Sequence, residues 1–256
     1  NKDFEATLRI KNKDRRRDKT GMLQARIGEL AQRALSHDAA LLSTLIVNGA
    51  ATTYAACYDT KALFADDHSV GSSGTIDNNI SVDISALPTG DTTGSHGSTT
   101  APSVGEMALS IQAAITTLYG FKDDQGEPAN EFMSEVIVMV PPSLSAVAQA
   151  AIASVYMAQG MSNPIVLGQK SPSGAMLRID VVVNPRMTSW TDKFAVFRAD
   201  APFKPFIIQL EVAPMLKALA EGSDNEFMNN EVLFSVEKSG NVGLGRFDEA
   251  VLVTMT

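Results

Sequence analysis

Apolar and polar residues alternate at the beginning of the chain and then recur with the period of a helix. Between positions 4 and 10 every second residue is apolar, which predicts a half-buried strand, here one arm of an extended hairpin. From Met22 to Asn48 apolar side chains return every three or four residues, which predicts a single amphipathic helix. Its roughly 26 residues correspond to about 40 Å, and Gly49 is placed to end it.

Shorter periodic segments follow in the second half of the chain. The strand predicted over 136–140 is uninterruptedly apolar and lies between two predicted helices, which indicates a strand covered on both faces. The fold class is therefore α+β, with a small mixed sheet and flanking helices. The predicted helices are 104–119 and 143–158, the other strands are 177–183, 193–198 and 206–212, and a final hairpin has arms 231–238 and 242–253 with a turn at 239–241.

A long polar stretch separates the predicted long helix from this second half. Of the 35 residues from 71 to 105, 26 are Gly, Ser, Thr, Asp, Asn or Pro, which is too polar to bury and too rich in turn formers for regular structure. Only Ile80, Val82 and Ile84 alternate as a short strand. We interpret the stretch as a surface insertion that is ordered chiefly by its neighbours.

The charge of the chain is unevenly distributed. In total 21 Lys and Arg face 29 Asp and Glu, which gives a net charge of −8. The segment from Arg9 to Lys19 nevertheless carries seven cations and two acids, or +5, so that the remainder carries −13. Such a division favours contact between copies of the molecule. The interface candidates are Lys13, Arg15, Arg16, Arg17 and Lys19.

Two other interpretations of the basic segment stay open. It could be a solvated hairpin tip without a partner, as exposed charge runs commonly are. It could also bind nucleic acid through phosphates, but no aromatic residues interleave with the cations and the acidic remainder would repel a polyanion.

Candidate catalytic chemistry is sparse. The densest polar cluster consists of Asp59, Asp66, Asp67 and His68, and a histidine with carboxylates can hold a metal ion, which would make the chain a metal-dependent hydrolase. The alternative is a turn whose aspartates bind local backbone N–H groups. Cys57 has no obvious base beside it and is expected to be a buried thiol. We therefore expect no enzyme activity and no cofactor.

Several local strings resemble the major head subunit of Mu-like phages and prophages, a family with the Hong Kong 97-type capsid fold. The most specific are YDTKALFADDH from Tyr58 to His68, and SDNEFM from Ser223 running through GNVGLG at Gly240. The segments 136–152 and 181–185 are similar to the axial-domain pattern of tailed-phage capsids. These strings carry no catalytic residues. Another phage structural component, such as a tail or decoration protein, is disfavoured by the long helix.

The resemblance implies a division of the chain into capsid domains. Residues 1–20 would be part of an extended loop that lies over the adjacent subunit, and 21–50 a peripheral domain containing a long spine helix. Residues 51–103 would form the polar insertion, 104–222 an axial domain, and 223–256 the β-hairpin of the peripheral domain.

The resemblance also implies the partners. The subunit would associate with itself into the hexamers and pentamers of an icosahedral shell around double-stranded DNA, which it would touch weakly and non-specifically. Scaffold, maturation protease and portal are further implied partners, and the implied location is the virion, with assembly in the host cytoplasm. No segment approaches the roughly 18 to 20 consecutive apolar residues that a membrane-spanning helix needs, so no membrane partner is expected.

Overall fold

The structure is a computed structural model, and it describes residues 1–256 except 89–94, 155–161, 164, 166–169, 171–173 and 175. The chain divides into two compact units. The first unit combines residues 1–42 with 208–243, and the second combines 43–207 with 244–256. Each unit therefore contains segments that are far apart in the sequence. Among the described helices, none is both long and apolar enough to cross a membrane.

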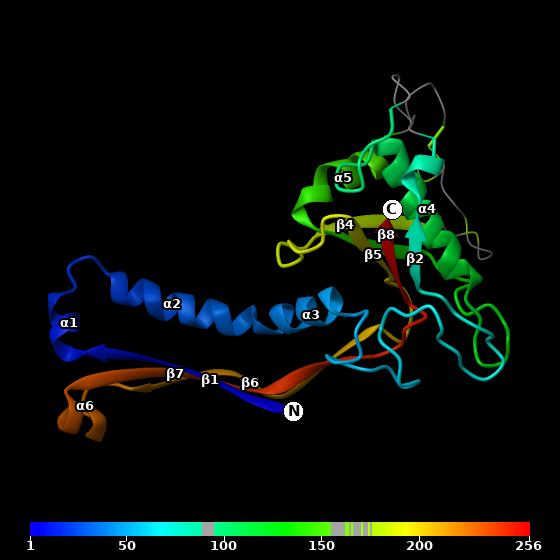
Figure 1. The fold of residues 1–256 in the computed structure, drawn as a ribbon. Helices are drawn as coiled ribbons and strands as arrows, with labels where there is room; N and C mark the ends of the chain where they lie inside the picture. The colour runs from blue at the N-terminus through cyan, green and yellow to red at the C-terminus, as the bar shows by residue number, and fades with distance from the viewer. Residues whose placement is uncertain (89–94, 155–161, 164, 166–169, 171–173, 175) are drawn as a thin grey trace. The chain divides into compact units, whose positions relative to one another are not determined.

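A three-stranded antiparallel ribbon with helices beside it makes up the first unit (Figure 1). The strand order is β1-β7-β6, and β1 pairs with β7 from Lys2 opposite Gly240 to Lys11 opposite Glu231. The elements are β1 (Lys2–Lys11), α1 (Asn12–Arg17), α2 (Met22–Leu35), the first half of α3 (His37–Val47), β6 (Phe206–Leu219), α6 (Asp224–Asn229) and β7 (Glu231–Leu244).

The alternation at the start of the chain places its apolar residues on one face of this ribbon. Ala6 lies opposite Val236 and Ile10 lies opposite Val232, so both strands contribute apolar side chains to the same face. The ring of Phe4 meets the ring of His37 at 4.3 Å between centroids, which joins this face to the helical layer. The predicted strand is confirmed, but its partner is β7 and not the second arm of a hairpin formed by neighbouring residues.

The predicted long helix is interrupted once. Residues 22–35 form α2 and residues 37–47 form α3, with Ser36 between them. The amide of Ser36 donates to the carbonyl of Gln32 at 3.0 Å, and the amide of Ala40 donates to the carbonyl of Ser36 at 3.1 Å, so helical hydrogen bonds continue on both sides of the break. The periodicity identified the helical residues correctly but did not reveal this break.

A five-stranded mixed sheet forms the core of the second unit. The order is β2-β8-β5-β3-β4, in which β2 runs parallel to β8 and β3 runs parallel to β4, while the two inner pairs are antiparallel. The prediction of a mixed sheet with helices is thus confirmed. The strands are β2 (Asn79–Val82), β3 (Glu135–Val140), β4 (Arg178–Val183), β5 (Lys193–Arg198) and β8 (Ala250–Met255).

The helices of this unit supply much of its buried surface. Helix α4 (Val104–Gly120) begins with a capping box, in which Ser103 and Glu106 satisfy each other's backbone amides. The side chains of Ile111, Ile115 and Leu118 are completely buried along one stripe of it. Helix α5 (Ser145–Ala153) follows the 3-10 turn η2 (Pro142–Leu144), and the end of the helix predicted over 143–158 lies outside the described residues.

Two predictions about strands in the C-terminal half of the chain are wrong. Residues 239–241 do not turn, because β7 runs straight through them, with β1 and β6 as its neighbours. The predicted return arm is instead β8, which belongs to the other sheet. Strand β3 is fully buried at alternate positions such as Val138 and half-buried at Ile137 between them, so it is not completely covered on both faces.

The polar stretch behaves partly as expected. Its short predicted strand is present as β2, and Ile84 begins the 3-10 turn η1 (Ile84–Ala86), which Asp83 caps through the amide of Ser85 at 2.9 Å. Residues 89–94 lie outside the described part.

Candidate functional site

The predicted interface cations gather at one end of the first unit. Lys13, Arg15, Arg16 and Arg17 are exposed on or beside α1, and Lys19 is exposed in the turn that leads to α2. This cationic tip (residues 13–19) is anchored by Asn12, which is buried and bonded to the neighbouring α6 segment. The Asn12 amide donates to the carbonyl of Asn230 at 3.0 Å, and its side-chain nitrogen donates to a carboxylate oxygen of Glu226 at 2.6 Å.

One arginine of the tip has a partner within its own chain. A guanidinium nitrogen of Arg15 lies 3.2 Å from a carboxylate oxygen of Glu221, and both side chains are substantially exposed. Within the described part of the chain no ion pair involves Lys13, Arg16, Arg17 or Lys19. These four cations are therefore the members of the tip that remain available to another molecule.

Asp18, one of the two acids of the basic segment, is bound by backbone groups near the start of α2. Asp18 accepts from the amide of Leu23 at 2.9 Å and from the amide of Thr20 at 3.0 Å, so its carboxylate serves the start of α2. The hydrogen bond from Leu23 and those from Thr20 lower the pKa of Asp18 to about 2. The carboxylate of Asp18 is thus held by backbone and hydroxyl groups and is not an ion-pair partner of Arg17.

The Asp59 and His68 cluster is a packed, hydrogen-bonded element. The Nδ1 atom of His68 lies 2.5 Å from a carboxylate oxygen of Asp59, and its Nε2 atom lies 3.2 Å from the carbonyl oxygen of Leu63. Both ring nitrogens are thus occupied by acceptor groups. The buried ring also stacks on Phe247 at 3.9 Å between centroids. Each ring nitrogen is therefore directed at a group of its own chain and not at an open ligand position.

The other two carboxylates of the metal hypothesis do not converge on this histidine. Asp67 forms an ion pair with Lys61 on the surface, and the hydrogen bond from that lysine lowers the pKa of Asp67. In the described ranges no group of three or more His, Cys, Asp or Glu side chains could hold a metal ion. Asp59 also accepts from the amide of Lys61 at 3.1 Å, as expected for a turn.

Cys57 lies in the same segment and is a buried thiol, as its surroundings in the sequence suggested. Burial, with a smaller contribution from the charge of Asp59, raises the pKa of the Cys57 thiol to about 12. The thiolate form that a nucleophile requires is therefore disfavoured.

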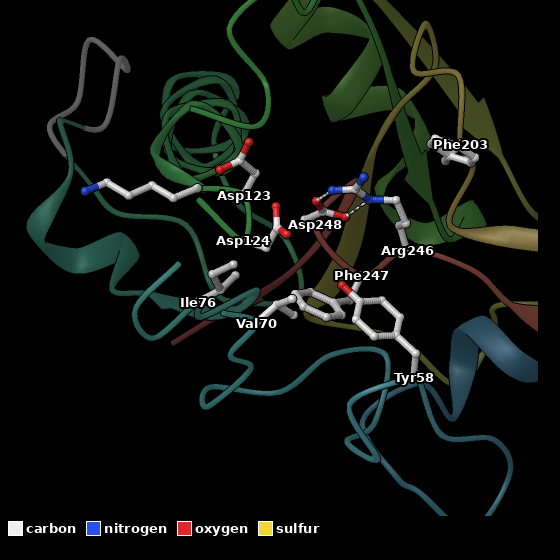
Figure 2. Close-up of a pocket in the computed structure, with 10 residues that line it drawn as sticks. Tyr58, Val70, Ile76, Asp123, Asp124, Phe203, Arg246, Phe247 and Asp248 are labelled. Atoms are coloured by element: carbon white, nitrogen blue, oxygen red, sulfur yellow. Dashed lines mark hydrogen bonds and ion pairs between the residues drawn. The ribbon is translucent and has the colours of Figure 1, made fainter. Parts of the chain in front are cut away.

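A cavity that the sequence did not predict lies in the second unit, beside Phe247. It has a volume of about 470 Å³. Figure 2 shows the side chains of Tyr58, Asp123 and Asp124 projecting around an ion pair between Arg246 and Asp248. It is lined by Tyr58, Val70, Ile76, Lys122, Asp123, Asp124, Phe203, Arg246, Phe247 and Asp248.

Two exposed aromatic rings border this cavity. Tyr58 is 59% exposed although its ring stacks on Phe247 at 5.3 Å, and Phe203 is 64% exposed. Burial of the hydroxyl, followed by the charge of Asp248, raises the pKa of Tyr58 to about 12, which keeps the phenol neutral. No signal in the sequence could have found these rings, because isolated aromatic residues in loops carry no periodicity.

The carboxylates of the cavity are held by a tight turn. The side chain of Asp123 accepts from the backbone amides of Gln125 and Glu127, each at 2.9 Å. The carbonyl of Asp124 accepts from the amide of Ser72 at 2.7 Å, which fixes the turn to the polar stretch. The side chain of Asp124 is exposed, and its carboxylate accepts from the side-chain nitrogen (Nε2) of Gln125 at 3.2 Å.

Comparisons with solved structures define the class of fold. The chain is similar to a structure described as the capsid of the cyanophage P-SCSP1u, with 10% identity, a TM-score of 0.52, and coverage of 99% of this chain and 72% of that chain. It is also similar to the asymmetric unit of the bacteriophage PhiM1 mature capsid, with 12% identity, a TM-score of 0.50, and coverage of 100% and 71%. The fold is that of phage capsid proteins of the Hong Kong 97 type.

The family comparison narrows this class. Residues 1–90 match the model of the family described as Mu-like prophage major head subunit gpT. The matched range includes the cationic tip, both parts of the interrupted helix and the Asp59 and His68 cluster. No curated protein matches the sequence. This match covers 90 of the 256 residues of the chain, and the solved structures define its fold.

Proposed function

We propose that the chain is the building unit of a phage head, which associates with copies of itself into the hexamers and pentamers of an icosahedral shell around double-stranded DNA. The observation that carries the proposal is the match of residues 1–90 to a major head subunit family in a chain with a capsid fold. In this role the protein has no catalytic activity and needs no cofactor, because its work consists of repeated contacts between subunits.

The cationic tip is one proposed contact with a neighbouring subunit. Lys13, Arg16, Arg17 and Lys19 are exposed and lack an ion-pair partner in the described chain, while the rest of the molecule is strongly acidic. Opposite charges on two subunits set their register and orientation more than their affinity. Arg15 contributes less to this contact, because Glu221 of its own subunit already engages it.

Further proposed partners follow from the same role. During assembly in the host cytoplasm the subunit meets a scaffold, a maturation protease and a portal, and in the virion it meets packaged DNA. The net charge of −8 supports weak contact with DNA, since a broadly acidic wall repels phosphates.

Electron microscopy of the purified protein tests the proposal. We expect shells in negatively stained samples and a fast-sedimenting species in velocity centrifugation. Reversal of Arg15, Arg16 and Arg17 to Glu should abolish shells and leave a folded subunit, because the one ion pair lost within the chain is exposed and is worth about 1 kcal/mol or less.

A matched variant separates the tip from general charge effects. Reversal of the exposed Arg26 and Arg33 of α2 to Glu changes two charges outside the tip and should leave shell formation intact. Normal shells from the triple variant would refute the role of the tip. A protein that stays monomeric under every condition of concentration and salt would refute the shell itself.

A further inference from the structure

The cationic tip includes Arg17, whose guanidinium group forms no ion pair within the described part of the chain. Arg17 is exposed at the last residue of α1, and the neighbouring carboxylate of Asp18 is held by the start of α2. A planar guanidinium binds best where it can stack on an aromatic face and bond a carboxylate at the same time. A complementary site would therefore combine exposed rings with accessible acids.

The cavity beside Phe247 has this combination. The rings of Tyr58 and Phe203 are both more than half exposed, and the carboxylate of Asp124 is exposed on a turn that backbone hydrogen bonds fix in place. The lining contains three carboxylates and two cations. The Arg246 cation is neutralised by Asp248, which bonds it through two nitrogens, so Arg246 does not by itself repel a second guanidinium.

We propose that this cavity receives the cationic tip of a second copy of the chain, with Arg17 between the rings of Tyr58 and Phe203 and the carboxylate of Asp124. The inference rests on the proposed function and gives one contact between subunits a definite acceptor. A second copy is the fitting occupant, because the chain itself carries both a cationic tip with the exposed Arg17 and an anionic, aromatic cavity. Because the tip and the cavity are different surfaces, the contact between two copies is heterologous and can repeat from copy to copy.

Chemical crosslinking between two populations of the full chain tests this contact. One population carries Arg16→Cys, which leaves Arg17 in place, and the other carries Lys122→Cys, which leaves the rings and carboxylates in place. The native Cys57 is buried and is retained, so the parent protein measures the background. With a short bismaleimide and two different affinity tags, we expect a heterodimeric product at least tenfold above background, weakened by high salt.

Matched positions define the specificity of the product. In one control the tip cysteine is moved to Arg26, an exposed position outside the tip (Arg26→Cys). In the other the cavity cysteine is moved to Arg186, an exposed position of the second unit outside the cavity (Arg186→Cys). Both should give background yields. Asp124→Lys in the acceptor should lower the yield at least fivefold, and Arg17→Glu in the donor should restore it with that acceptor.

Each result separates the contact from the shell. Shells in the microscope without the heterodimeric product would overturn this inference and leave the proposed function standing. The product without shells would support the contact and count against the shell. Equal yields with Lys122→Cys and Arg186→Cys as acceptors would overturn the inference.

Discussion

Replacement of Glu249 by Gln should stabilise the subunit at neutral and alkaline pH. The Glu249 side chain is only 5% exposed, and one of its carboxylate oxygens has no hydrogen-bond partner in the described chain. The other oxygen lies 3.8 Å from a guanidinium nitrogen of Arg198. The guanidinium group of Arg198 already donates to Asp200 at 2.8 Å and to Asn130 at 2.9 Å. Glu249 is therefore a buried acid with a weak partner.

The magnitude follows from the pKa of this carboxyl. Burial raises the pKa of Glu249 to about 7, and Arg198 offsets only part of the effect. The separation between about 7 and the usual value near 4.3 corresponds to roughly 3.7 kcal/mol, and residual solvent screening reduces this to on the order of 2 kcal/mol. Because the folded state holds the proton more tightly, stability falls as pH rises from about 4.3 to about 7 and then stays low.

Urea unfolding of the unassembled subunit measures this effect. We expect Glu249→Gln and the parent to have similar free energies of unfolding near pH 4.5, and the variant to be more stable by about 2 kcal/mol at pH 8. Glu127→Gln, on an exposed turn, provides the control and should follow the parent at every pH. A variant that tracks the parent from pH 4.5 to 8 would refute the reasoning, since the buried charge would then have no cost.

Two further predictions concern the packing of the second unit. Asn78→Ala should lower the free energy of unfolding by roughly 3 kcal/mol, because the buried side-chain amide forms hydrogen bonds with three backbone groups at 2.8 to 3.0 Å. Asn79→Ala is the control and should lower it far less, as measured by thermal or urea unfolding. Gly245→Ala should destabilise the unit, because a Cβ there would overlap the carbonyl oxygen of Lys204, while Gly243→Ala meets nothing within 4 Å. Equal melting temperatures for the two glycine variants would contradict the assigned close approach.

Much of the local structure could be predicted from the sequence. The predicted strand over 193–198 coincides with β5, and the helix predicted over 104–119 differs from α4 by one residue. Periodicity is informative here because each element buries one face, and burial leaves its period in the chain. The same pattern did not reveal the break at Ser36, since helical spacing continues across it.

Long-range pairing could not be predicted in the same way. The sequence predicts a strand over 242–253 and a turn at 239–241, so the preceding strand is the expected pairing partner in a hairpin. The structure instead continues β7 through Gly240, whose α-carbon faces Lys2 across the ribbon, and sends β8 into another sheet. An alternating pattern indicates which side of a strand is buried, but it does not indicate which other strand pairs with it.

The sequence by itself determined the α+β class, most helices and strands, and the separation of a basic segment from an acidic remainder. Only the tertiary structure decided that Arg15 is engaged by Glu221, that His68 is locked by Asp59, and that Glu249 is buried with a weak partner. The physical reason is distance along the chain. Charge and periodicity are properties of neighbouring residues, whereas a cavity or a buried ion pair depends on segments that meet only after folding.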